Sequence, residues 1–400
     1  MKRFLIETLL FWSICVCMSF AQTFTLLHDF ASSPDGNSSL AGLIRDAKGN
    51  LYGTTVGGGT FGLGTVFKAN GSDKEIVLYS FAGTLDGAYP RGALIGDSAG
   101  NLYGTTSEGG TSNFGTVFKV DPTGHETVLY NFVGNGDGKE PLGSLTMDAA
   151  GNLYGTTQQG GAAACGTVFK LDSTGNETVL YSFLGGNDGC SPAAGLVRDS
   201  AGNFYGTTVY GGLVNSCIQS CGVVFKVSPS GKEAVLYRFT GSGGDGNAPE
   251  GNLLRDAATG NLYGTTAEGG APHSKATVGN GIVFMLDPAG NETVLYAFLG
   301  TRVGGDGAGP PAGLVRDAAG NFYGTTNAGG AANFGTVFKL DTAGHETVLY
   351  SFTGGTDGEY PFGGLIRDAM GILYGAAWGG GLHKTACAPY GCGSIFKLTP

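Results

Sequence analysis

The chain has 400 residues, a net charge of −10 and only 14% charged residues. An acidic sequence without a cluster of Lys and Arg argues against nucleic acid or an anionic membrane surface as a partner. Gly is unusually frequent, with 76 residues, but it recurs between short runs rich in Val, Leu, Phe, Tyr and Thr, a pattern typical of short strands joined by tight turns and not of a disordered chain.

Residues 1–21 have the pattern of a Sec-type signal peptide. Lys2 and Arg3 give a positive start, an apolar run extends from Leu9 to Met18, and small residues surround a cleavage point after Ala21. An uncleaved anchor is the alternative, but the apolar run is shorter than a bilayer-spanning helix. We therefore expect a secreted or periplasmic mature chain of residues 22–400 with no membrane span.

A tandem repeat organises the remaining sequence into one expected domain, residues 22–400. The stretch Leu102 to Thr106, Leu-Tyr-Gly-Thr-Thr, returns roughly every fifty residues. Its tyrosine falls at Tyr52, Tyr103, Tyr154, Tyr205, Tyr263, Tyr323 and Tyr374. Units of this size bury a core only by stacking against their neighbours.

Each repeat contains four strand-like runs, which we name A to D. In the second repeat they are Ala93–Ile95, Leu102–Thr106, Gly115–Val120 and Glu126–Phe132, joined by turns that carry Asp, Pro and Gly. This order predicts a four-stranded antiparallel meander. Strand D is apolar on both faces, so the meanders must cover one another, which favours an all-β, seven-bladed β-propeller. A linear solenoid is the alternative, but it needs polar caps that the sequence does not show.

The two ends of the chain predict how the ring closes. Thr23 to Phe30 resembles a strand D with no strand C before it, and the last repeat stops after its strand C at Ser394 to Lys397. We therefore expect the N-terminal strand to pair in the last blade.

The loops predict a candidate binding face. In an antiparallel meander the B–C and D–A loops lie at the same end of a blade, and we call this end the loop face. The B–C loops are longest in repeats four, five and seven. Insertions in repeat proteins often lie on the binding face, although neutral variation in exposed loops is the alternative.

Aromatic and histidine residues in these loops are the candidate ligand-binding residues. Trp378 stands where the other repeats have Val56, Ser107, Gln158, Val209, Ala267 and Asn327. With Tyr210 and Tyr390 in nearby loops, it is expected to form a stacking platform for sugar rings or peptide; local packing is the alternative. His273 and His383 lie in inserted loops without an evident nucleophile or metal partner.

An even number of cysteines beyond the signal predicts disulfides in an exported chain. Adjacent positions favour Cys217–Cys221 and Cys387–Cys392 as local bridges. A bridge between Cys165 in a B–C loop and Cys190 in the next D–A loop is also expected, because both lie on the loop face.

Every D–A loop contains Asp-Gly. A closed ring would bring these carboxylates near one mouth of the channel, so Asp86, Asp137, Asp188 and Asp357 are weak candidates for Ca²⁺ ligands. Turn chemistry, repeated in every blade, is the favoured explanation. We therefore expect no cofactor, and Ca²⁺ is kept only as a weak candidate. No residue is predicted to be catalytic, since no Ser-His-Asp order, HExxH or phosphate loop is present.

The segment from Ala312 to Phe352 carries the repeat in its clearest form, A-G-L-x-R-D-x-x-G-N-x-Y-G-T-T-x-x-G-G, then G-T-V-F-K-x-D and G-x-E-T-V-L-Y-x-F. This unit resembles the tandem repeat of the choice-of-anchor, GloVer-containing bacterial proteins, and the resemblance covers essentially all of the mature chain. It implies an exported propeller-type repeat and supplies no catalytic residues. Those proteins carry varied C-terminal surface anchors, whereas no anchor is seen before Pro400, so we expect release or periplasmic residence.

Two classes of function follow. The favoured one is a monomeric, non-catalytic binding or scaffold module whose loop face holds an extracellular or periplasmic protein or glycan. The alternative is a propeller enzyme of the lyase or lactone-hydrolase type, with a cation or carboxylates at the channel mouth. Catalytic sites usually break repeat symmetry, whereas the polar residues here mostly repeat, which favours binding.

Overall fold

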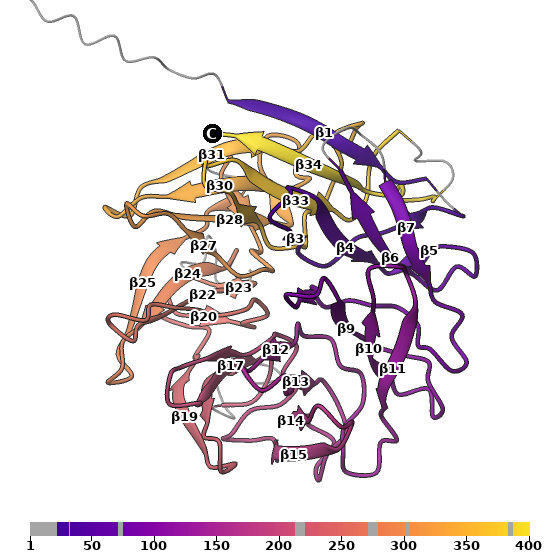
Figure 1. Cartoon of the computed structure of the whole chain (residues 1–400). Helices are drawn as coiled ribbons and strands as arrows, with labels where there is room; N and C mark the ends of the chain where they lie inside the picture. The colour runs from indigo at the N-terminus through magenta and orange to yellow at the C-terminus, as the bar shows by residue number, and fades with distance from the viewer. Residues whose placement is uncertain are drawn as a thin grey trace, which may run out of the picture.

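The computed structural model describes residues 22–31, 33–70, 75–212, 221–270, 279–300, 305–382 and 387–400. Seven four-stranded antiparallel sheets stand around a central axis as the blades of a β-propeller (Figure 1). The predicted fold class is therefore confirmed. Among the described residues, no helix is long and apolar enough to cross a membrane. The expected signal peptide, residues 1–21, lies outside the described residues and remains a prediction.

The strands of each blade follow the predicted order A to D from the axis outwards. Strand A is short: β3 (Ile44–Arg45), β8 (Ile95–Gly96), β12 (Thr146–Met147), β16 (Val197–Arg198), β21 (Leu254–Arg255), β27 (Val315–Arg316) and β32 (Ile366–Arg367). Strand B carries the repeated motif: β4 (Leu51–Thr55), β9 (Leu102–Thr106), β13 (Leu153–Thr157), β17 (Phe204–Thr208), β22 (Leu262–Thr266), β28 (Phe322–Thr326) and β33 (Leu373–Ala377). Strand C comprises β6 (Thr65–Ala69), β10 (Thr116–Val120), β14 (Thr167–Leu171), β18 (Val223–Val227), β24 (Ile282–Leu286), β30 (Thr336–Leu340) and β34 (Ser394–Thr399). Strand D comprises β7 (Glu75–Ser80), β11 (Glu126–Asn131), β15 (Glu177–Ser182), β19 (Glu233–Arg238), β25 (Glu292–Ala297), β31 (Glu346–Ser351) and, in the seventh blade, β1 (Thr23–Asp29).

The N-terminal strand closes the ring, as predicted. Strand β1 pairs antiparallel with β34, from Thr23 opposite Thr399 to Asp29 opposite Ser394 (Figure 1). The seventh blade is therefore built from both ends of the described chain.

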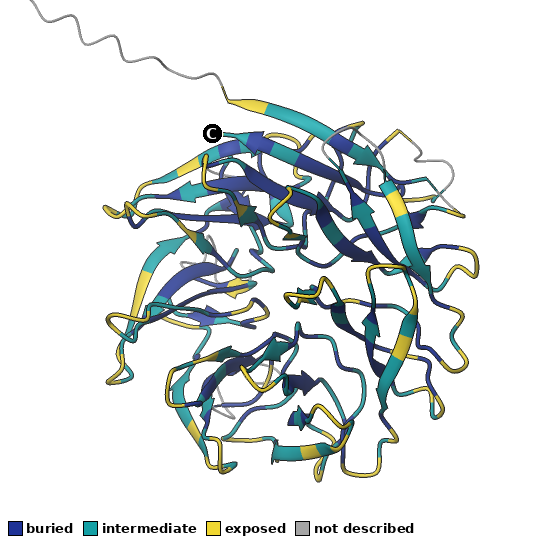
Figure 2. Ribbon diagram, viewed as in Figure 1, coloured by how far each residue is buried: buried dark blue, intermediate teal, exposed yellow. Residues whose placement is uncertain are grey.

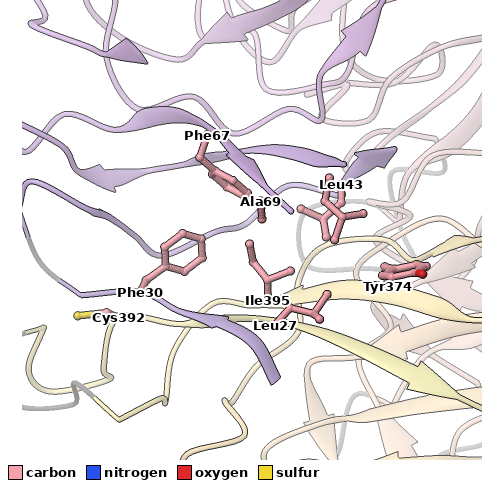
Figure 3. Close-up of a cluster of buried hydrophobic side chains, with 9 residues drawn as sticks. Leu27, Phe30, Leu43, Phe67, Ala69, Tyr374, Cys392 and Ile395 are labelled. Atoms are coloured by element: carbon pink, nitrogen blue, oxygen red, sulfur yellow. The ribbon is translucent and has the colours of Figure 1, made fainter. Parts of the chain in front are cut away.

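Edge-to-face phenylalanine pairs join each blade to the next. A buried Phe after strand D packs on the strand C Phe of the following blade, and at the closure these are Phe30 and Phe67, with ring centroids 5.3 Å apart (Figure 3). The other six pairs are Phe81–Phe118, Phe132–Phe169, Phe183–Phe225, Phe239–Phe284, Phe298–Phe338 and Phe352–Phe396. Burial is concentrated in strands B and C, between neighbouring blades (Figure 2).

The repeated Leu-Tyr-Gly-Thr-Thr motif is explained by packing. The hydroxyl of Tyr103 donates to Asp97 Oδ2 at 2.9 Å, fixing the A–B turn. A Cβ on Gly104 would lie only 2.6 Å from the ring of Phe118, so this close approach requires glycine. The Thr106 hydroxyl lies 2.9 Å from that of Thr116 on strand C. The motif is a fold element and not an active site.

The D–A and B–C loops share one end of the blades, and they also pair with each other. Two-stranded sheets form from β2 (Gly36–Asn37) with β5 (Gly57–Gly58), β20 (Gly246–Asn247) with β23 (Glu268–Gly269), and β26 (Gly307–Ala308) with β29 (Ala328–Gly329). Single bridges join Ala88 to Glu108, Lys139 to Gln159, Cys190 to Tyr210 and Glu359 to Gly379. The loop face is therefore held together by backbone hydrogen bonds in every blade.

Candidate ligand-binding site

A cavity of about 290 Å³ lies on the axis of the propeller, lined by the segments that enter strand A in all seven blades. Its wall consists mainly of glycine and alanine. A Cβ on Gly143 would lie 2.5 Å from the carbonyl oxygen of Ala194 in the next blade, and one on Gly363 would lie 2.5 Å from that of Ala41. The small residues of this wall are therefore required by the contact between neighbouring backbones.

One position of the wall varies from blade to blade. It is occupied by Leu40, Arg91, Leu142, Ala193, Glu250, Pro311 and Phe362. The two charged side chains, Arg91 and Glu250, are exposed and belong to the second and fifth blades. The side chain of Glu250 is exposed to the channel, but the protein atoms crowded around it reduce its hydration. This loss of hydration, and then the charge of Glu268, raise the pKa of Glu250. This variable ring sets the chemistry of the channel entrance.

Two further polar residues of the wall hold the blades together. The hydroxyl of Ser144 accepts a hydrogen bond from the backbone N–H of Ala93 at 3.2 Å, and the side-chain oxygen of Asn252 accepts one from Gly195 at 2.6 Å. Both bonds join adjacent blades, so these oxygens are already engaged.

Three aromatic side chains gather around Trp378 on the loop face of the seventh blade, and we call the four residues together the Trp378 cluster. The indole centroid lies 5.1 Å from that of Tyr390, 6.1 Å from that of Phe362 and 6.3 Å from that of Tyr360. Phe362 also lines the axial cavity, so the cluster extends from the channel outwards. Tyr390 is 50% exposed and Trp378 is partly exposed. Such a surface can stack against the flat apolar face of a ligand.

The backbone beneath the cluster is tightly held. Tyr360 has a left-handed φ of 54°, which a residue with a side chain rarely adopts. Its N–H donates to the Phe334 carbonyl of the sixth blade at 2.9 Å, and its own carbonyl accepts from Trp378 N–H at 3.1 Å. The same position has a positive φ in every blade, at Ser38, Tyr89, Glu140, Ser191, Ala248, Gly309 and Tyr360. Strain of this kind persists where the surroundings fix the backbone.

The disulfide between Cys387 and Cys392 encloses Tyr390 in a short loop, and this predicted pair is confirmed. Within it, Gly391 N–H donates to the Cys387 carbonyl at 3.0 Å, and the Tyr390 carbonyl accepts from Gly380 N–H at 2.6 Å. The covalent bridge therefore holds Tyr390 beside Trp378.

The other predicted disulfides are confirmed as far as the structure describes them. Cys165 and Cys190 form a disulfide between two loops of the loop face. Cys221 is also disulfide-bonded, and its expected partner, Cys217, lies outside the described residues.

The predicted ligand-binding residues divide into three groups. Trp378 and Tyr390 are brought together. Tyr210 is 39% exposed but belongs to the fourth blade, where its backbone pairs with Cys190. His273 and His383 lie outside the described residues.

The Asp-Gly carboxylates do not line the axial cavity, unlike the expectation from the sequence. Each of the four candidates, Asp86, Asp137, Asp188 and Asp357, lies in a D–A loop and accepts a hydrogen bond from the tyrosine of the strand D that precedes it. The pairs are Tyr79–Asp86 at 2.7 Å, and Tyr130–Asp137, Tyr181–Asp188 and Tyr350–Asp357 at 2.9 Å. The chain reaches the channel only several residues later, at Arg91 in the second blade. A Ca²⁺ role for these residues remains a prediction.

Sequence reasoning missed Tyr360 and Phe362. They flank Pro361 in the last D–A loop, at two positions whose residue type changes from repeat to repeat. That variation from repeat to repeat is the signal in the sequence that marks them.

The sequence profile described as the Gloeobacter/Verrucomicrobia repeat matches residues 14–218 and 185–388. No curated protein matches the chain. Among solved structures, the extracellular domain of a putative hybrid two-component system from B. thetaiotaomicron has a TM-score of 0.58 at 10% identity, covering 94% of this chain and 39% of that one. A GH74 enzyme from Niastella koreensis has a TM-score of 0.51 at 16% identity, covering 85% of this chain and 50% of that one. The chain thus spans half or less of both proteins, and the likeness shows the propeller fold alone.

Proposed function

Since the chain belongs to the Gloeobacter/Verrucomicrobia repeat family, we propose that it is an exported, non-catalytic binding module that holds a glycan on the loop face of its propeller. The Trp378 cluster is the observation that carries this proposal. It is a partly exposed aromatic surface at a place where the other blades have small, aliphatic or amide side chains. Sugar rings present apolar faces that stack on such surfaces, with hydroxyl groups left for the rims.

The geometry of the cluster supports a preformed site. Tyr390 is fixed by a disulfide, Tyr360 by backbone bonds to two blades, and Phe362 by its place in the channel wall. A ligand stacked on Trp378 also reaches the axial cavity through Phe362, because the two rings are in contact. Disulfides additionally support an oxidising compartment outside the cytoplasm.

The enzymatic alternative has less support. Among the described residues, Glu250 is the single carboxylate that lines the axial cavity. Hydrolysis of glycosides generally uses a pair of carboxylates, and a Ca²⁺ site takes six to eight oxygen ligands. The lining supplies neither arrangement.

A glycan array probed with residues 22–400 tests the proposal. Trp378→Ala is expected to weaken binding of the captured glycan by about 2 kcal/mol or more, because a central aromatic residue usually dominates its site. Tyr390→Ala should weaken binding as well. Phe61→Ala is the matched control, since Phe61 is a 59% exposed aromatic residue in the B–C loop of the first blade.

If the Phe61 and Trp378 variants lost the same amount of glycan affinity, the Trp378 cluster would not be the binding site. If the protein bound no glycan but bound a secreted protein in a way that required Trp378, the loop face would instead be a site for a protein partner.

A further inference from the structure

The seam between the seventh and first blades has a different side chain at one position that is otherwise constant in strand D. In six blades strand D carries a tyrosine at the position that faces the Asp of the D–A loop: Tyr79, Tyr130, Tyr181, Tyr237, Tyr296 and Tyr350. In β1 this position is His28, whose Nε2 lies 3.2 Å from Asp35 Oδ2. An imidazole therefore replaces a phenol at the point where the ring closes.

A glutamate from the first blade completes a group of three. The ligand atoms of His28, Asp35 and Glu75 all lie within 4.8 Å of one another, and all three side chains are partly buried. Glu75 Oε1 is buried without a hydrogen-bond partner. Within the described part of the chain, this seam holds the one group of three His, Cys, Asp or Glu side chains whose ligand atoms lie this close together.

The neighbouring seams provide internal comparisons. Between the first and second blades, Asp86 and Glu126 are present but the third side chain is Tyr79. Between the sixth and seventh blades the tyrosine is kept, but Phe24 stacks on Tyr350 at 4.1 Å. An imidazole with two carboxylates is thus specific to the closing seam among those described.

We propose that His28, Asp35 and Glu75 form a binding site for a divalent first-row transition ion, with Zn²⁺ as the representative. Imidazole and carboxylate are ordinary Zn²⁺ ligands, and three protein ligands leave a fourth position for water. Metal–ligand distances of about 2.0–2.1 Å separate tetrahedral ligands by about 3.3 Å, close to the distance between His28 and Asp35. Glu75 completes the set by a rotation of its flexible side chain.

The site is accessible from outside. Asp35 and Glu75 line a surface cavity of about 490 Å³ together with Pro34, Thr60 and Tyr79. An ion can therefore reach Asp35 and Glu75 without opening the blades, and His28 lies next to these two carboxylates although it does not line the cavity itself.

The three ligands come from different parts of the ring. His28 lies on the N-terminal strand, Asp35 on the loop that follows it, and Glu75 on the outer strand of the first blade. A bound ion would cross-link the N-terminal strand to the first blade and stabilise the closed ring, because the unfolded chain does not hold the three ligands together.

Zinc titration of residues 22–400, stripped with a chelator, tests the proposal by calorimetry, metal analysis and thermal unfolding. The wild-type protein should bind one equivalent of Zn²⁺. At a free concentration of 100 times Kd, its unfolding equilibrium constant should fall about 100-fold. His28→Tyr restores the residue of the other blades and should abolish both responses while keeping the hydrogen bond to Asp35. Glu75→Gln should do the same, and Glu126→Gln, the equivalent change at the next seam, should leave both responses unchanged.

Several results would overturn the site: no stoichiometric zinc in the wild-type protein, equal binding by the wild-type protein and either site variant, or equal loss in the Glu126 variant. The proposal would also be contradicted if the protein bound Ca²⁺ and not Zn²⁺, and if the His28 variant bound Ca²⁺ as tightly as the wild-type protein does. A site made of oxygen ligands alone would then explain the data. If the His28 variant did not fold, Glu75→Gln would decide between these outcomes.

Discussion

Replacing Glu126 with Gln removes the charge, but hardly the shape, of a carboxyl between the first and second blades. Loss of hydration at this seam, and then the charge of Asp86, raise the pKa of Glu126 from its ordinary 4.5 to about 7. Its Oε1 is buried without a hydrogen-bond partner. Four further glutamates that open strand D, Glu177, Glu233, Glu292 and Glu346, also have a pKa raised to about 7.

A raised pKa in the folded chain makes stability fall as the pH rises. The folded protein holds the proton more tightly than the unfolded one, so the contribution is fully present below pH 4.5 and is lost as the pH passes through 7. A shift from 4.5 to about 7 corresponds to at most about 3.4 kcal/mol, at about 1.36 kcal/mol for each pH unit. Because the side chain is only partly buried, solvent screening reduces this to about 1 kcal/mol.

We therefore expect Glu126→Gln to raise the free energy of unfolding by about 1 kcal/mol at pH 8 and to change it by less than about 0.5 kcal/mol at pH 4.5. Urea unfolding at the two pH values measures both quantities. Glu108→Gln, at an exposed glutamate of the second blade, is the control and should have little effect at either pH. A Glu126 variant less stable than the wild-type protein at pH 8 would refute the reasoning, because the ionised carboxylate would then stabilise the seam.

Three further changes test the packing and the site. Phe30→Ala should lower the free energy of unfolding by about 3–5 kcal/mol in denaturant titrations, since it removes a fully buried ring from the closing seam; a loss under 1 kcal/mol would mean that the seam contributes little. Gly104→Ala should cost about 1–3 kcal/mol in the same assay, because its Cβ meets the ring of Phe118, and an unchanged midpoint would contradict that contact. Changing Cys387 and Cys392 together to Ser should speed release of the captured glycan in surface-binding kinetics while circular dichroism stays unchanged; unaltered release would show that the bridge does not position Tyr390.

The propeller could be predicted because each blade corresponds to one copy of the sequence repeat. The spacing of the motif around Tyr103 indicated seven units, and an unpaired strand from Thr23 to Phe30 indicated the closure that β1 and β34 make. The pairing of D–A with B–C loops was not predicted. Each of those contacts involves only one or two residues, such as Glu359 with Gly379. A pairing this short does not produce the alternation of apolar and polar residues by which a strand is recognised in a sequence.

The candidate site was only partly predictable. Trp378 breaks the repeat and Tyr390 lies in a nearby loop, and their rings do lie together, whereas Tyr210 belongs to another blade. Phe362 was missed because its contact with Trp378 depends on how the D–A loop turns inward after Pro361. The path of the D–A loop also explains the position of Asp86. This residue was expected at the channel, but it lies early in its loop, where it accepts a hydrogen bond from Tyr79 and does not line the axial cavity. His28 carried a readable signal, a histidine in a tyrosine series, but Glu75 joins it only through the closed ring.

The fluorescence of Trp378 tests ligand binding at the proposed site most directly. The chain has two tryptophans, and Trp12 lies in the expected signal, so Trp378 is the sole indole of residues 22–400. Titration with the glycan selected on the array should shift or quench its emission in a saturable way, with the Kd found by calorimetry, and Tyr390→Ala should weaken both together. Calorimetric binding of the glycan with unchanged Trp378 emission would contradict the proposed site, because the ligand would then bind away from the cluster.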